Sequence, residues 1–208
     1  MPILYYVHDP MCSWCWGFRR TWEKVQSQLP ETLEVNYLVG GLAPDSDQIM
    51  PQDLQNKLPQ IWQTIQAKIP GTEFNYDFWT KCQPRRSTYP ACRAVLTAKS
   101  LDASKEEAMI VGIQQAYYLK AQNPSDLDTL EDVAESIGLN KADFTKTISS
   151  QAIQNQLVHD IHKGQRIGAN GFPSLVMQLG EGSNIRFQYI PIDYNNASSI
   201  VENVTALI

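Results

Sequence analysis

Residues 8–17 read HDPMCSWCWG and place two cysteines, Cys12 and Cys15, three positions apart. The apolar run ILYYV at 3–7 precedes them and is typical of a central strand covered on both faces. After them, apolar residues recur at intervals of four, three and four, which predicts one face of a helix: Phe18, Trp22, Val25 and Leu29. The two cysteines therefore fall where a strand ends and a helix begins.

This location favours redox chemistry for the pair. The free N–H groups and the positive dipole end of a helix stabilise a thiolate, which is the form that attacks disulfides. The dipole supplies only ~0.3–1 kcal/mol, and one pKa unit corresponds to about 1.36 kcal/mol. Direct hydrogen bonds within the turn must therefore supply the rest. We expect Cys12 to be the exposed thiol that attacks, and Cys15 to resolve the mixed disulfide.

A metal site is the alternative interpretation of the same motif. A structural zinc ion is commonly held by four ligands at short spacings. The other cysteines, Cys82 and Cys92, are ten positions apart in another segment, and His8 is the one nearby candidate for a third ligand. The number of available ligands therefore favours a redox pair over a metal site. A metal-binding protein without catalytic activity is the alternative.

The rest of the chain divides into two patterns. A strand is predicted at 33–39, and residues 43–149 read as helices punctuated by prolines, without a strand. A helix at about 150–166 then leads to a short strand at 175–177, an alternating strand at 185–190 and a closing helical face at 200–207. The ends are therefore mixed α/β, and the middle is helical.

Composition narrows the class of partner. The 208 residues are 43% hydrophobic, enough for a substantial core, and the net charge of −5 argues against nucleic-acid binding, which needs a surplus of Lys and Arg. No apolar run approaches the roughly 18 residues of a membrane span. The first ten residues lack the features of a signal peptide. We expect a cytoplasmic protein with no membrane partner, or a periplasmic one if a leader has been removed.

Two motifs carry a resemblance to a known family. The segment CSWC with the following Trp16-Gly17, and GANGFPSLV at 168–176, resemble the DsbA-type thioredoxin superfamily. The pattern Asp-x-x-Cys-x-Trp-Cys from Asp9 to Cys15 is similar to the branch of predicted protein disulfide isomerases that includes FrnE-like proteins. The resemblance implies an α/β thioredoxin fold at 1–45 and 150–208, interrupted by an inserted all-helical domain at 46–149.

The same resemblance implies an activity and a site. Pro173 is expected to be a cis-proline facing the cysteine pair, with Phe172 presenting its backbone to an extended substrate and Trp14 beside it. The activity implied is that of a protein disulfide oxidoreductase or isomerase. It needs no bound cofactor, and its partners are protein or peptide thiols and disulfides, a thiol reductant or oxidant, and glutathione as an exchange partner.

Departures from the family pattern shape two further expectations. The residues between the cysteines are Ser13 and Trp14, with no histidine, so we expect a milder reduction potential than that of a strong oxidase. A rival function is that of a glutathione-dependent isomerase or transferase of the kappa-class and hydroxychromene-carboxylate isomerase type. That branch uses a serine at the nucleophile position, whereas this chain has Cys12.

Several neighbours of the pair are candidates for supporting roles. Asp9 is expected to cap or stabilise the turn or to assist proton transfer, and His8 to pair with the thiolate. By the resemblance, a helix of the insertion packs over the site, with a predicted set of groove residues: Arg85, Arg86, Ser87 and Cys92. Cys82 and Cys92 are predicted to be reduced thiols, with a second disulfide as the alternative.

Overall fold

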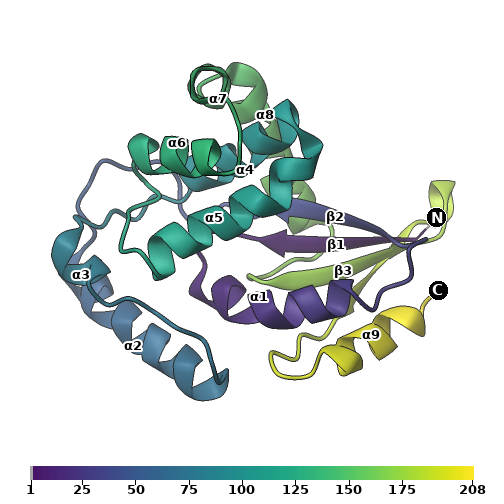
Figure 1. The fold of residues 1–208 in the computed structure, drawn as a ribbon. Helices are drawn as coiled ribbons and strands as arrows, with labels where there is room; N and C mark the ends of the chain where they lie inside the picture. The colour runs from purple at the N-terminus through teal and green to yellow at the C-terminus, as the bar shows by residue number, and fades with distance from the viewer. Residues whose placement is uncertain (1) are drawn as a thin grey trace.

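The computed structural model describes residues 2–208, and within them a four-stranded sheet has the order β2-β1-β3-β4 (Figure 1). β1 (Ile3–His8) pairs in parallel with β2 (Glu34–Val39), and antiparallel with β3 (Ser174–Leu179). β3 in turn pairs antiparallel with β4 (Arg186–Ile190). The strand that precedes the cysteine pair is thus one of the two central strands.

β1 is buried on both faces, which accounts for its continuous apolar sequence. Leu4 and Tyr6 belong to the main core cluster, whereas Tyr5 and Val7 belong to a second cluster on the opposite face of the sheet. The edge strand β4 differs. Its apolar residues Phe187 and Tyr189, and Ile185 just before it, are exposed. The alternating apolar residues of this strand therefore lie on a face of it that is open to solvent.

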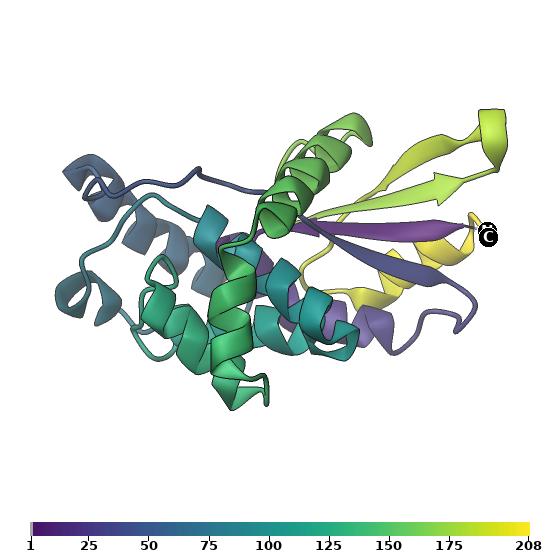
Figure 2. The same cartoon turned by 90° about the horizontal axis from the view of Figure 1, so that it is seen from above.

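Helices cover the sheet on its two sides (Figure 2). α1 (Ser13–Gln26) and α9 (Ala197–Thr205) lie on one side, and α8 (Gln151–Arg166) lies on the other. The apolar positions predicted for α1 are buried at Phe18, Trp22 and Val25. None of the helices within residues 2–208 is long and apolar enough to span a membrane.

The segment between β2 and α8 is helical, as predicted. In chain order it contains α2 (Gln52–Lys68), α3 (Phe78–Lys81), α4 (Tyr89–Leu101), the short 3₁₀ helix η1 (Ala103–Lys105), α5 (Glu106–Tyr118), α6 (Leu127–Ser136) and α7 (Lys141–Ile148). A second 3₁₀ turn, η2 (Gly182–Asn184), joins β3 to β4. Buried residues of α2 to α7 share one hydrophobic cluster with those of β1 and α1. The domain boundaries at 45/46 and 149/150 stay a prediction.

Candidate active site

Cys12 occupies the position just before α1, where a helix leaves its first N–H groups free. Its backbone is extended, and its carbonyl accepts the first helical hydrogen bond, from the Trp16 N–H at 3.1 Å. Cys12 is 7% exposed and Cys15, one turn later, is fully buried. The local sequence therefore produces one thiol that a partner can reach and one beneath it.

The two thiols have opposite acidities. The pKa of Cys12 is lowered, first by a hydrogen bond from the Cys15 thiol and then by the backbone N–H groups of Cys15 and Trp14. Burial and the negative charge of Asp9 oppose this lowering. The pKa of Cys15 is raised well above its usual value, mainly by burial. The sulfurs are not bonded to each other, and the arrangement makes Cys12 the better nucleophile.

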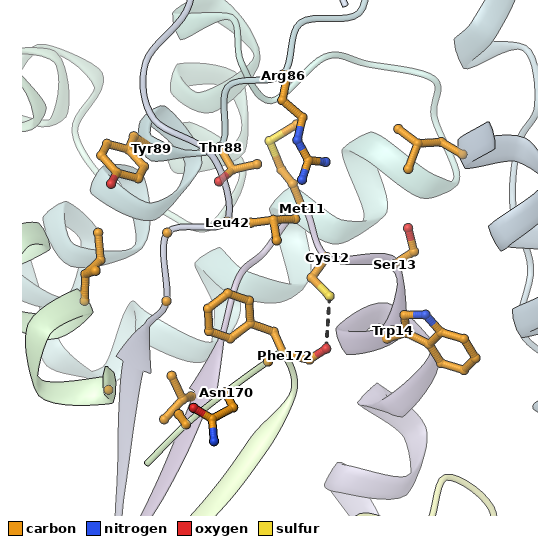
Figure 3. A pocket seen from close by; sticks show the side chains of 18 of the residues that line it. Met11, Cys12, Ser13, Trp14, Leu42, Arg86, Thr88, Tyr89, Asn170 and Phe172 are labelled. Carbon is orange, nitrogen blue, oxygen red and sulfur yellow. Dashed lines mark hydrogen bonds between the residues drawn. The ribbon is translucent and has the colours of Figure 1, made fainter. Parts of the chain in front are cut away.

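A loop before β3 lies against the Cys12 sulfur. The Phe172–Pro173 peptide bond is cis, and the Phe172 carbonyl oxygen accepts a hydrogen bond from the Cys12 thiol at 3.4 Å (Figure 3). Gly40, at the end of β2, packs so closely against the Phe172 ring that an added Cβ would overlap it. The lack of a side chain at Gly40 thus allows this loop to approach β2 closely.

Asp9 ties the active-site turn to two other segments. Its carboxylate is fully buried and accepts hydrogen bonds from the Met11 N–H at 2.8 Å, the Leu42 N–H at 2.7 Å and the Thr88 hydroxyl at 2.7 Å. Burial raises the pKa of this carboxyl, and these donors oppose the rise. Asp9 therefore stabilises the turn, which is the structural alternative predicted for it.

His8 does not pair with the thiolate as expected. It is fully buried between the rings of Tyr6 and Tyr37, and within residues 2–208 neither of its ring nitrogens has a hydrogen-bond partner. Burial lowers its pKa to about 3, with a further contribution from the charge of Lys99. A neutral, unpaired ring cannot stabilise the Cys12 thiolate, because it carries no charge and makes no contact with the sulfur.

The other two cysteines are free thiols in separate contacts. The Cys82 thiol donates to the Ala121 carbonyl at 3.0 Å, and the buried Cys92 thiol contacts the Asp9 carboxylate at 3.5 Å. They are not bonded to each other in the structure. Cys92 supports the site through Asp9 and does not line the groove.

A groove of about 620 Å³ opens above Cys12, between the loop before β3 and the insertion. Arg85 and Arg86 line it, as predicted, whereas Ser87 and Cys92 do not. Arg85 is held by the Asp126 carboxylate at 2.6 Å. Arg86 is exposed, and in the described part of the chain it has no ion-pair partner (Figure 3). The charged residues lining this groove are thus both cationic.

The insertion also holds the active-site turn from behind, through residues that the sequence did not single out. The Trp62 ring N–H of α2 donates to the Ser13 hydroxyl at 3.1 Å, and the Tyr118 hydroxyl of α5 donates to the Met11 carbonyl at 2.7 Å. Both side chains are fully buried. The sequence holds one indication of these contacts. Each of the two aromatic residues stands at a buried helix position, and a buried Tyr or Trp usually needs a hydrogen-bond partner for its hydroxyl or ring N–H.

Metal ligands do not converge at this site or elsewhere in residues 2–208. Within that range, no group of three or more His, Cys, Asp and Glu side chains could hold a metal ion.

The sheet order, the inserted helices and the cysteine pair at a helix N-terminus define a thioredoxin-type fold with a dithiol site. The chain belongs to the DSBA-like thioredoxin domain family, whose model matches residues 4–204. That family comprises thiol–disulfide oxidoreductases.

Individual relatives are distant in sequence. The structure of a putative protein disulfide isomerase from Nitrosomonas europaea superposes with a TM-score of 0.84 at 24% identity, over 99% of this chain and 96% of that one. The cytosolic disulfide reductase DsbM from Pseudomonas aeruginosa, determined with GSH, gives a TM-score of 0.75 at 21% identity, over 98% of each chain.

The ClpXP adapter protein SpxH of Halalkalibacterium halodurans is 20% identical over 83% of this chain. The chain spans 57% of the length of that relative, and 56% of the length of SpxH from Bacillus subtilis.

Proposed function

We propose that the protein reduces or isomerises disulfides in polypeptides through Cys12 and Cys15. The observation that carries this proposal is the position of the Cys12 sulfur. This sulfur lies at a helix N-terminus, above the buried Cys15 thiol and at the floor of an open groove. The pKa of the Cys12 thiol is lowered there. A reducing compartment such as the cytoplasm suits this direction of exchange, because its thiol pool keeps the pair reduced.

The exchange proceeds in two displacements. The Cys12 thiolate attacks one sulfur of the substrate disulfide, so that a mixed disulfide forms and the other substrate sulfur leaves as a thiolate. Cys15 then attacks Cys12, closes the Cys12–Cys15 disulfide and releases the second substrate thiol. In isomerisation, a substrate thiol attacks the mixed disulfide instead. Cys12 is then released reduced.

An extended polypeptide is the substrate that the surface suits best. Trp14 and Phe172 line the groove above Cys12, and they also line a second hollow of about 710 Å³ on their other side, next to Tyr194. The two hollows share these two side chains, and Cys12 lines the first of them. A chain lying through both would bring its disulfide to Cys12, with Phe172 at the crossing point.

The first test is the equilibrium reduction potential of the pair. We expect a two-electron midpoint between about −270 and −180 mV, the range from thioredoxin to protein disulfide isomerase. The reason is that burial and the Asp9 charge oppose the Cys12 thiolate, while no histidine lies between the cysteines to stabilise it. The protein is equilibrated in glutathione buffers, and its thiols are trapped and counted by mass. A midpoint near about −120 mV would instead indicate a strong oxidase.

Glutathione is a second candidate partner, supported by the charge of the groove. Glutathione carries two carboxylates, and Arg86 offers a guanidinium at the groove above Cys12 that has no ion-pair partner within residues 2–208. We expect Arg86→Gln to raise KM for a glutathionylated peptide about three- to tenfold, from the loss of one charge-assisted contact, with kcat unchanged. Arg166→Gln, which removes an exposed arginine of α8 that does not line the groove, serves as the control. Equal KM values for the two variants would exclude Arg86 as a glutathione contact.

A further inference from the structure

A second, smaller cavity lies behind the site, on the buried side of Cys15. Its volume is about 60 Å³, and it is lined by residues of α1, α5 and the first two strands, with the exposed Glu107 among them. It shares no lining residue with the groove above Cys12. A single water needs roughly 10–15 Å³ of such volume, so the cavity has room for a few waters next to a thiol that has no access to solvent.

The cavity is polar where it meets the thiol. The Tyr6 hydroxyl interacts with the Cys15 thiol, and both residues line the cavity. Gln114, which is 2% exposed, also lines it, and its side-chain oxygen has no hydrogen-bond partner within residues 2–208. A buried amide oxygen without a protein partner, on a residue that lines a cavity of this size, is a position where a bound water can supply the missing hydrogen bond.

Polar groups continue from this cavity to the surface. The Gln26 amide donates to the Tyr37 hydroxyl at 2.8 Å and to the Glu107 carboxylate at 3.2 Å. All three of these residues line the cavity, and Glu107 is exposed. The residues thus lead from Cys15 to a carboxylate in contact with solvent.

Resolution of the mixed disulfide creates a need for such a route. Cys15 must lose its proton before it attacks, and at that moment a bound substrate covers the groove side of Cys12. We propose that water held by Gln114 in this cavity carries the Cys15 proton to Glu107 during resolution. The inference rests on the proposed function. Gln114 acts here as a positioning residue, because it does not touch the reacting sulfurs.

The Cys15 S–H bond gives its proton to cavity water, and the thiolate attacks the Cys12 sulfur. The Cys12–Cys15 bond forms, and the bond between Cys12 and the substrate breaks. The substrate sulfur leaves with the electron pair and is reduced, while the cysteine pair is oxidised. The proton passes to Glu107 and then to solvent.

The test separates the two displacements by stopped flow. The substrate is a disulfide peptide with a different fluorophore on each half, so that attack appears as a bimolecular phase and resolution as a unimolecular one. The variant is Gln114→Leu. The matched control is Gln115→Leu, the next residue of α5, which does not line the cavity. Glu107→Gln, at an exposed position, tests the same route without a change in the core.

We expect Gln114→Leu and Glu107→Gln to slow resolution about tenfold or more at neutral pH, in line with the usual gain from assisted proton transfer. The deficit should shrink as pH rises, because hydroxide can then take the proton, and the attack phase should not change. The titratable and charged groups around the thiol and the cavity that bear on this profile are Tyr6, Asp9, Cys12, Arg19, Glu23, Tyr37, Glu107, Tyr118 and Tyr194.

Three outcomes would overturn the inference. One is resolution in Gln114→Leu as fast as in Gln115→Leu at every pH. Another is an equal slowing of both phases at every pH, which would indicate a packing defect. The third is an unchanged profile in Glu107→Gln, and this variant decides the matter if Gln114→Leu does not fold. A wild-type protein without any unimolecular phase would instead contradict the proposed function itself.

Discussion

Cys12→Ser is expected to reduce disulfide exchange to the uncatalysed background, whereas Cys15→Ser should retain the attack and stop after it. The reason is that Cys12 carries the stabilised thiolate at the groove, while Cys15 lies beneath it with a raised pKa. In Cys15→Ser the mixed disulfide has no internal thiol to resolve it. Intact mass measurement of the variant after mixing with a disulfide peptide should show one attached peptide half per chain, released by dithiothreitol.

Cys82→Ser is the matched control for the loss of a thiol. Cys82 is in contact with the Ala121 carbonyl and does not line the groove, so its removal should leave the exchange rate within about twofold of wild type, as for most substitutions away from the site. If Cys15→Ser catalysed a glutathione-dependent isomerisation at the wild-type rate, the glutathione-isomerase interpretation of the chain would replace the one proposed here.

Asp9→Ala is expected to lower the free energy of unfolding by about 3 kcal/mol at neutral pH. The carboxylate joins the turn before α1, the segment after β2 and the start of α4, and its removal leaves the N–H groups of Met11 and Leu42 and the Thr88 hydroxyl without this acceptor. Urea unfolding measures the change. Asp45→Ala, which removes an exposed carboxylate paired with Arg93, should cost no more than about 1 kcal/mol.

The pH dependence of this difference has a defined sign. Because burial raises the pKa of Asp9, the folded protein holds this proton more tightly than the unfolded chain does. The advantage of wild type over Asp9→Ala should therefore be greatest below about pH 3.8, the ordinary value, and should decrease as pH rises through the folded pKa. An advantage that grew with pH would show that the hydrogen bonds to the carboxylate outweigh its burial.

The same residue also bears on the reactive thiol. The Asp9 charge raises the pKa of Cys12, so Asp9→Asn, which keeps the shape of the side chain, should make the Cys12 thiol more acidic. The rate of iodoacetamide alkylation, followed against pH, reports this change. A Cys12 pKa in Asp9→Asn equal to that of wild type would show that Asp9 acts on the turn through its hydrogen bonds alone.

The fold class and the dithiol were predictable because the signals for both are local. Apolar runs and helical spacing within about fifteen residues place a strand, two cysteines and a helix in that order, and the free N–H groups at a helix start follow from backbone geometry alone. The helical nature of the insertion follows in the same way. The resemblance of two short motifs to a known family added the loop at Phe172 and Pro173.

The supporting contacts were not predictable, since they join residues that are distant in the chain. Thr88 reaches Asp9 across 79 positions, and Tyr118 reaches the Met11 carbonyl across 107. No periodicity records which buried hydroxyl meets which backbone group. His8 was misjudged for the same reason, because only the packed structure shows that its ring lies between two tyrosines and, within residues 2–208, has no hydrogen-bond partner.

Local signals in the sequence thus specify the order of elements, the pair of cysteines and the helix end on which their chemistry depends. Only the packed chain shows which distant groups hold the turn, which charge opposes the thiolate and which cavity lies behind Cys15. The physical reason is that propensity and spacing act over a few residues, whereas burial and electrostatics depend on what the folded chain brings together. In this protein the insertion contacts the turn that follows β1 and begins α1, and burial at this turn acts on the pKa of both sulfurs.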